Sequence, residues 1–313
     1  MSLEIIGAES MGVRSLCCRV TLPDRCIVID PGVALGYVRY GLPPHPVQIA
    51  VGRRIRERIL DVLEDATDVV FSHFHGDHIP LVDANPYQLS VRSLPRTFRE
   101  LRAWSKSGND LTGKVRTRFE DLADLLGDNL QVAEGRSEGR LSFSHAVPHG
   151  APDSEMGSVM MTRVEMDGAV FVHASDIQLL DAPTIDLLIG WRPDIVLAAG
   201  PPLYLDRLSN TARETAWCNA MRLAQHVKVV ILDHHLMRNR EGAGWLGALS
   251  TSVGKQVYCA ADYMRQPRRL LEAERERWYQ EMTVPAGWHD DYAQDQVNLD
   301  RYIDQLRSQG LQD

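Results

Sequence analysis

The sequence contains no run approaching the roughly 20 consecutive apolar residues that a membrane-spanning helix requires. Its first residues also lack the basic segment followed by an apolar segment that marks a secretory signal. The chain has only five cysteines, and they form no CxxC motif. An odd, scattered set of this kind is typical of reduced, buried thiols. We therefore expect a cytoplasmic protein without a membrane segment.

An excess of positive charge is absent as well. The formal net charge is −8 at pH 7, which argues against a general binder of polyanions. One segment departs from this average, with only Glu100 and Asp110 opposing its cations. These cations are Arg92, Arg96, Arg99, Arg102, Lys106, Lys114, Arg116 and Arg118. Such a patch could hold a phosphate or a nucleic-acid backbone, but the solvated face of a surface helix is the simpler interpretation. Nucleic acid is therefore a possible partner that the sequence does not favour.

The most informative segment is Ser72-His73-Phe74-His75-Gly76-Asp77-His78. It follows the apolar, β-branched run Val69-Val70-Phe71, which predicts a strand, so the cluster lies on the loop where that strand ends. Imidazole and carboxylate are ligands that suit Zn²⁺, Fe²⁺ or Mn²⁺. We expect His73 and His75 to face one metal, and Asp77 and His78 to face a second beside it. A chance cluster of exposed loop histidines is the alternative, but the HxHxDH spacing favours coordination.

Further ligands are needed, and residues at the ends of other apolar segments offer them. His149 lies in a Pro-His-Gly turn, and we prefer it over His145, which we expect to be structural or to support a ligand without binding the metal. Asp176 follows an apolar strand and could bridge both metals. His234 or His235 follows the run Val229 to Leu232, and we favour His234 only slightly. Asp30, at the end of another predicted strand, is expected to orient a ligand.

Each of these residues also has an ordinary structural explanation. Asp176 could be the N-cap of a helix, because residues 177–189 have a helix-like pattern. His234 could be a polar residue at a strand end whose hydrogen bonds are satisfied. Their order along the chain, each after a predicted strand, favours a shared metal site over these separate explanations.

The order HxHxDH, then His, then Asp, then His resembles the metallo-β-lactamase fold superfamily, from about Leu3 to about Ala260. Several segments more narrowly resemble an uncharacterised, mainly archaeal branch of predicted metal-dependent hydrolases. These are Glu9–Ser15, Asp30–Leu35, Arg39–Pro44, Ala174–Gln178, Gly200–Pro202 and Leu232–Leu236. One departure is Ser175, because many members of the superfamily have glycine before the bridging aspartate. The resemblance implies the fold and metal chemistry, and it says little about the substrate.

The expected fold class is therefore α/β, an αββα sandwich with a helical insertion and a helical C-terminal extension. The sandwich domain would span residues 1–260, with residues 83–140 as an insertion that could cover the active site. Helix-like pieces are expected there at 96–106 and 119–126. Residues 261–313 would form the extension, packed on the core or on a partner chain. The oligomeric state is not predicted.

The expected chemistry is that of a metal-dependent hydrolase with two divalent ions, zinc first, with manganese or iron as alternatives. A hydroxide bridging the metals would attack an ester, thioester, lactone, amide or phosphoester of a small molecule. Asp77 would orient this hydroxide or accept its proton. Candidates for contacting the substrate or leaving group are Ser10, Arg14, Tyr40 and His145. A nuclease or phosphodiesterase using the same site and a mononuclear-iron oxygenase are the alternative functions.

Overall fold

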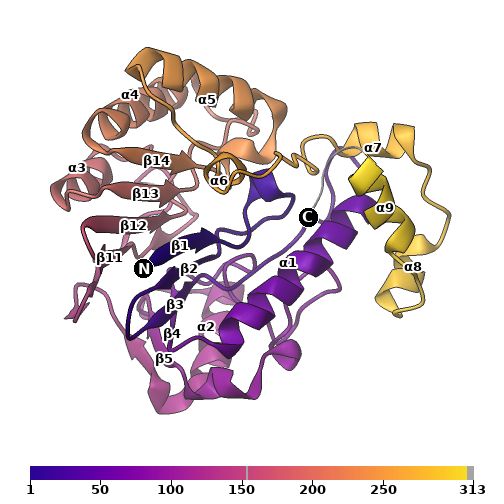
Figure 1. The fold of residues 1–313 in the computed structure, drawn as a ribbon, viewed down its shortest axis with the longest axis horizontal. Helices are drawn as coiled ribbons and strands as arrows, with labels where there is room; N and C mark the ends of the chain where they lie inside the picture. The colour runs from indigo at the N-terminus through magenta and orange to yellow at the C-terminus, as the bar shows by residue number, and fades with distance from the viewer. Residues whose placement is uncertain (153, 309–313) are drawn as a thin grey trace.

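Two six-stranded mixed sheets form the centre of the protein, and helices cover their outer faces (Figure 1). The computed structural model describes residues 1–152 and 154–308. Helices α1 and α2 lie on the side of the first sheet, and α3, α4 and α5 lie on the side of the second (Figure 1). This is the αββα sandwich that the sequence predicts. In the described part of the chain, no helix combines the length and apolar character needed to cross a membrane.

The first sheet begins with an antiparallel meander and continues as parallel strands. Its strands are, in spatial order, β1 (Ser2–Ile5), β2 (Cys18–Thr21), β3 (Cys26–Ile29), β4 (Asp68–Phe71), β5 (Arg102–Ser105) and β6 (Leu130–Val132). All four residues of β4 are buried, as expected for a central parallel strand covered on both faces. The carboxyl ends of β3 and β4 therefore open at the same edge of the sheet.

The second sheet repeats this plan, because its antiparallel strands come first in the chain and its parallel strands come last. Its spatial order is β14 (Val229–Leu232), β13 (Ile195–Ala198), β12 (Ala169–Ser175), β11 (Thr162–Met166), β8 (Leu141–Phe143) and β7 (Ser137–Glu138). A separate short hairpin pairs β9 (Val147–Pro148) with β10 (Ser158–Val159). The polar residues at the ends of β12 and β14 thus leave the sheet at the same edge, because both strands run parallel to β13 between them.

Helix α1 (Pro46–Glu64) agrees with the apolar spacing in this stretch. Its buried face includes Ile49, Ile55 and Ile59, and proline at its first position is compatible with a helix start. The other long helices are α2 (Gly113–Leu126), α3 (Ala182–Gly190), α4 (Asn210–His226) and α5 (Arg240–Val253).

The segment 83–140 carries helices and also contributes to the first sheet. The helix expected over residues 96–106 is wrong in its second half, where a short 3₁₀ helix (Arg96–Glu100) gives way to strand β5. Pairing with β4 decides this, because Ala103 and Trp104 of β5 are buried beside it. Local helix propensity is overridden by such packing. The role of this segment as a cover for the site stays a prediction.

The chain after residue 260 is helical, with α6 (Ala260–Tyr263), α7 (Arg275–Glu281), α8 (Trp288–Ala293) and α9 (Asp300–Ser308). Helices α7 to α9 lie outside α1, with α9 beside it (Figure 1). Arg14 forms two hydrogen bonds with the buried carboxylate of Glu272, the shorter of them 2.5 Å long. The extension is therefore tied to the sandwich by charge as well as by packing.

The start of α1 should make stability depend on pH. The buried ring of His45 accepts a hydrogen bond from the Val47 amide through Nδ1 (3.2 Å), and its Nε2 lies 3.0 Å from the Met282 carbonyl. Burial lowers the pKa of His45 to about 4, against about 6.5 in an unfolded chain. Between these values the unfolded state binds more protons, so stability falls as the pH falls. The contribution lost is roughly 3 kcal/mol.

Urea unfolding at several pH values tests this expectation. His45→Gln should flatten the loss of unfolding free energy between about pH 6.5 and pH 4, because glutamine does not titrate there. His145→Gln, at an exposed histidine, should keep the wild-type slope. An unchanged slope in His45→Gln would show that other groups cause the acid sensitivity.

Candidate metal centre

The loop after β4 carries the HxHxDH segment into the interior. His73 and His78 are buried, while His75 and Asp77 are partly exposed. A turn closes the loop, because the His78 amide donates to the His75 carbonyl (3.0 Å). The loop therefore directs several side chains to one point, as its position after a buried strand predicts.

Asp176, on the loop after β12, lies at the centre of the histidine cluster. Its Oδ2 lies within 3.7 Å of the Nε2 atoms of five imidazoles. The distances are 3.2 Å for His78 and His149, 3.4 Å for His235, and 3.7 Å for His73 and His234. The carboxylate of Asp176, which follows β12, is thus surrounded by histidines that follow strands β4, β9 and β14.

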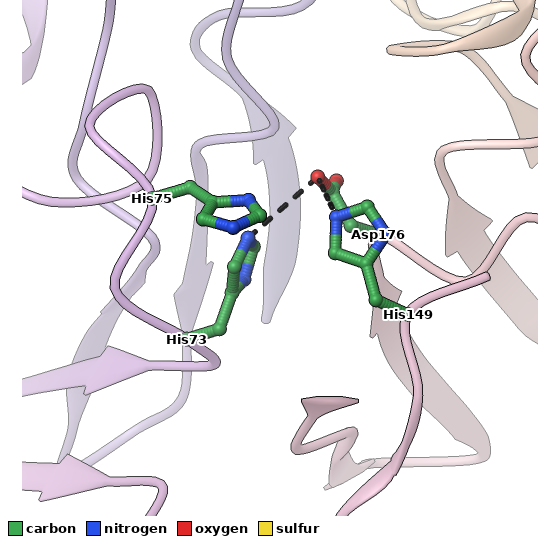
Figure 2. Close-up of side chains that lie close together, drawn as sticks. All are labelled: His73, His75, His149 and Asp176. Carbon is green, nitrogen blue, oxygen red and sulfur yellow. Dashed lines mark ion pairs between the residues drawn. The ribbon is translucent and has the colours of Figure 1, made fainter. Parts of the chain in front are cut away.

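Four overlapping groups with ligand spacing are found among the described residues, and two of them correspond to the two metal sets expected from the sequence. One contains His73, His75, His149 and Asp176, whose candidate ligand atoms all lie within 4.8 Å of one another. Figure 2 shows the two rings of the β4 loop on one side of the Asp176 carboxylate and the His149 ring on the other.

The other group contains Asp77, His78 and His234, with the same spacing limit. Oδ2 of Asp77 lies 3.3 Å from Nε2 of His234. Candidate ligand atoms of His235, Asp176 and His234 also lie within 4.8 Å of one another. The structure thus brings together every ligand that the sequence analysis names, including both members of the His234/His235 alternative.

Buried ligand atoms without hydrogen-bond partners make the cluster suitable for metal ions. Among the described residues, these atoms are Nε2 of His73, His78 and His149, and Oδ1 of Asp176. A buried polar atom without a partner costs roughly 1–3 kcal/mol. A divalent cation would use such lone pairs, and imidazole with carboxylate is a donor set that binds zinc, manganese or iron. The residues present therefore fit the metal that the fold implies.

Protonation in the cluster follows from burial and from the central carboxylate. Burial, with nearby imidazoles, lowers the pKa of His73, and it lowers that of His75 to about 4. These rings are therefore neutral at pH 7, which is the form that binds metal. Burial alone would lower the pKa of His78, but Asp176 and Asp30 outweigh it and hold that pKa well above its usual range. A metal at Nε2 of His78 would displace a proton.

Asp30 lies where it can orient the ligand loop. Its Oδ2 lies 2.9 Å from Nδ1 of His78 and accepts from the Ser72 hydroxyl, and its Oδ1 accepts from the Ser72 amide. A carboxylate at Nδ1 fixes the ring and leaves Nε2 to point at the cluster. Asp30 itself has a left-handed backbone (φ 50°). This arrangement is the one expected of a residue that supports a ligand without binding the metal.

Ser175 occupies the position at which this chain departs from the glycine of the pattern that it resembles. Its φ is 55°, in the left-handed region where glycine is favoured and other residues cost about 1–2 kcal/mol. Its hydroxyl lies 2.7 Å from the Ser72 hydroxyl and 3.5 Å from Nδ1 of His73. The serine therefore adds hydrogen bonds beneath the cluster that a glycine could not supply.

Gln178 is a residue that the sequence analysis misses. Its amide nitrogen lies 3.4 Å from Nδ1 of His149 and 3.2 Å from Nδ1 of His235. A half-turn of the amide exchanges its oxygen and nitrogen, so the oxygen can accept from Nδ1–H and leave Nε2 free to bind. Its position two residues after Asp176 is the only signal in the sequence.

Gln178→Leu should weaken metal affinity by about 10- to 100-fold, because the candidate ligand His149, and His235 beside it, would lose the group that fixes their Nδ1 atoms. Competition against a chromophoric chelator measures the affinity. Gln131→Leu, at an exposed position in β6, is the matched control and should bind as the wild type does. A folded Gln178→Leu protein with wild-type affinity would contradict the orienting role.

Arg238 is the second residue missed. It is buried, and its Nη2 lies 2.9 Å from Nε2 of His234 while its Nη1 donates to the Tyr204 hydroxyl (3.1 Å). Its Nε also donates to Glu9 (3.3 Å). A buried arginine at this distance competes with a metal for Nε2 of His234. Nothing in the local pattern indicates this contact.

Four other candidates lie outside the cluster. The Ser10 hydroxyl donates to Asp233 and accepts from the Ala261 amide, so it links structural elements. Arg14 is paired with Glu272, as described above. Tyr40 is exposed and its ring faces Arg39. His145 is exposed beside Gly135 and lines a cavity with Arg163 and Trp191, and its role as a structural or substrate-contacting residue stays a prediction.

Comparisons with known proteins agree with this architecture. A UPF0282 protein of Methanosarcina mazei is 46% identical over 303 residues, covering 97% of this chain and all of the relative. A UPF0282 protein of Methanopyrus kandleri is 32% identical, covering 88% of this chain and 98% of the relative. No model in a scan against protein-family models matches the chain.

Two solved structures are similar in fold. An isothiocyanate hydrolase from Delia radicum gut bacteria has a TM-score of 0.50 at 15% identity, covering 79% of this chain and 93% of that one. The metallo-β-lactamase fold protein YhfI of Bacillus subtilis has a TM-score of 0.50 at 12% identity, covering 82% and 94%. The metallo-β-lactamase fold and the resemblance to an archaeal branch are thereby confirmed.

Proposed function

Because the chain belongs to the UPF0282 protein family and has the metallo-β-lactamase fold, we propose that it is a metal-dependent hydrolase of a small molecule. The observation that carries the proposal is the convergence of five imidazole Nε2 atoms on the Asp176 carboxylate. A set of this size exceeds what one ion takes from a protein in a catalytic zinc site. It therefore supports two divalent ions, with zinc as the first choice and manganese or iron next.

The ligands divide into two sets that share Asp176. His73, His75 and His149 would hold one ion, and Asp77, His78 and His234 would hold the other. His235 is the alternative to His234, because its Nε2 also faces Asp176 and its Nδ1 lies beside Gln178. Elemental analysis of His234→Ala and His235→Ala decides between them, since only the true ligand should lower the metal content.

Once bound, the ions would lower the pKa of water toward neutrality and polarise the oxygen of the scissile group. Asp77 is the group of this chain that can orient the water and take its proton. Its side chain is 17% exposed, so its carboxylate borders solvent. Burial alone would raise the pKa of Asp77, but the hydrogen bond from His234 and the charge of His78 outweigh it and hold that pKa well below its usual range.

The attacked bond would belong to an ester, thioester, lactone, amide or phosphoester. Removal and return of metal tests the proposal on chromogenic substrates of these classes. Chelated and dialysed protein should lose hydrolysis together with its metal, and Zn²⁺ or Mn²⁺ should restore both. Mg²⁺ or Ca²⁺ should not, because these ions prefer all-oxygen sites. Hydrolysis that persists after complete metal removal would contradict the proposal, and oxygen consumption with one iron per chain would favour an oxygenase.

A further inference from the structure

We infer that the loop between β3 and α1 forms an anion-binding arm of the active site, in which Arg39 binds a carboxylate or phosphate group of the substrate. This inference rests on the proposed function and narrows its substrate class to anionic molecules. It depends on the position of Arg39, on the absence of a carboxylate partner for it among the described residues, and on the apolar side chains around it.

The loop has a rigid tip. Arg39 and Leu42 exchange two backbone hydrogen bonds of 2.9 Å, and the two residues between them, Tyr40 and Gly41, have φ of 55° and 72°. Positive φ at both central residues is the pattern of the tight turn that best fits a twisted hairpin. The backbone of Arg39 is therefore fixed although the tip reaches solvent.

The Arg39 guanidinium is also fixed, by two aromatic rings. Its Cζ lies 4.8 Å from the ring centre of Tyr40 and 5.2 Å from that of Tyr204. Tyr204 belongs to the loop after β13 in the other half of the sandwich, and its ring centre lies 6.5 Å from that of His235. The Tyr204 ring thus contacts both Arg39 and His235, one of the candidate metal ligands.

The charge of Arg39 has no counter-ion in the described chain. Nε of Arg39 is buried without a hydrogen-bond partner, and none of the ion pairs found within residues 1–152 and 154–308 includes this side chain. The neighbouring arginines differ, because Arg14 pairs with Glu272 and Arg238 with Glu9. Arg39 thus combines contacts with two aromatic rings and a charge that no carboxylate of the described residues neutralises.

A planar guanidinium with a free edge recognises oxyanions through paired hydrogen bonds. The side chains beside Arg39 indicate what the rest of the ligand resembles. Tyr37, Val38 and Tyr40 are 64%, 59% and 46% exposed, which places three large apolar side chains on one short loop. The substrate would therefore combine an acidic group, bound by Arg39, with an apolar body that packs on these side chains.

Calorimetric titration of zinc-loaded protein with phenylphosphonate and with phenylacetate tests the inference, and methyl phenylacetate serves as the uncharged probe. Arg39→Gln should weaken binding of at least one acidic probe by about 10-fold or more, because a charge-assisted hydrogen bond is lost. Arg39→Lys should recover part of the affinity. Arg92→Gln, at an exposed arginine outside the site, should bind as the wild type does. The uncharged probe should not distinguish any of these proteins.

The acidic probe with the larger loss identifies the oxyanion. Equal affinity of Arg39→Gln and wild type for both acids would overturn the inference. Metal content is measured on the same samples, so failure of the proposed function appears separately as a protein that takes up no metal. In that case the titration of the metal-free protein decides the role of Arg39, and equal affinities again overturn it.

Discussion

Asp176→Ala should lower the metal content of the protein from about two equivalents per chain to less than about one. The carboxylate of Asp176 lies within 3.7 Å of ligand nitrogens from both sets. Its removal takes a donor from each set and also removes negative charge between two dications. Two such ions about 4 Å apart repel strongly unless an anion separates them. Both sites should therefore weaken together.

Elemental analysis after purification without added metal measures this effect, and circular dichroism verifies the fold. Asp24→Ala is the matched control, because it removes a carboxylate from an exposed turn between β2 and β3. The control should keep the wild-type stoichiometry. A folded Asp176→Ala protein that still binds two equivalents would contradict the central position of this carboxylate.

Gly32→Ala should cost several kcal/mol of unfolding free energy and abolish binding to the set that contains His78. A Cβ on residue 32 would lie 2.1 Å from the Ile79 nitrogen and 2.2 Å from the carbonyl carbon of His78. These are backbone atoms of the segment that closes the ligand loop, so they cannot turn away as a side chain would. Overpacking against fixed backbone belongs to the most destabilising kinds of substitution.

Urea unfolding and metal titration of the same protein measure both parts of this prediction. Gly247→Ala provides the control, since a Cβ there meets nothing within 4 Å and the residue lies inside helix α5. It should raise stability by about 0.5–1 kcal/mol. A Gly32→Ala protein as stable as wild type and with equal metal affinity would contradict the close approach of the segment after β3 to the ligand loop.

Much of the candidate centre can be predicted from the sequence because its ligands follow strands directly. His73, His75, Asp77 and His78 form a local pattern after an apolar run, and Asp176 and His234 each follow another. Adjacent parallel strands end at the same edge of a sheet. Local patterns of this kind therefore locate the ligands without knowledge of the packing. The same reasoning predicts that Asp30 lies beside the ligand loop.

The sequence does not reveal contacts between distant segments that have no shared local pattern. Arg238, at the end of a 3₁₀ helix, reaches Glu9, and Arg39 reaches Tyr204 across the two halves. His145 lies only four residues before His149, yet only His149 follows strand β9 into the interior, while His145 is exposed. Strand β5 likewise replaces a predicted helix because it pairs with β4.

The sequence by itself thus determined the types of the candidate ligands and their order, because residue spacing is a local property, and the resemblance that this order carries implied the fold class. The tertiary structure alone decided that Gln178 lies beside two rings of the cluster, that Arg39 has no counter-ion among the described residues, and where glycine is required. These depend on the packing of segments that are far apart in the chain. The close approach of Gly32 to His78 and the placement of Gln178 between two rings are of this kind.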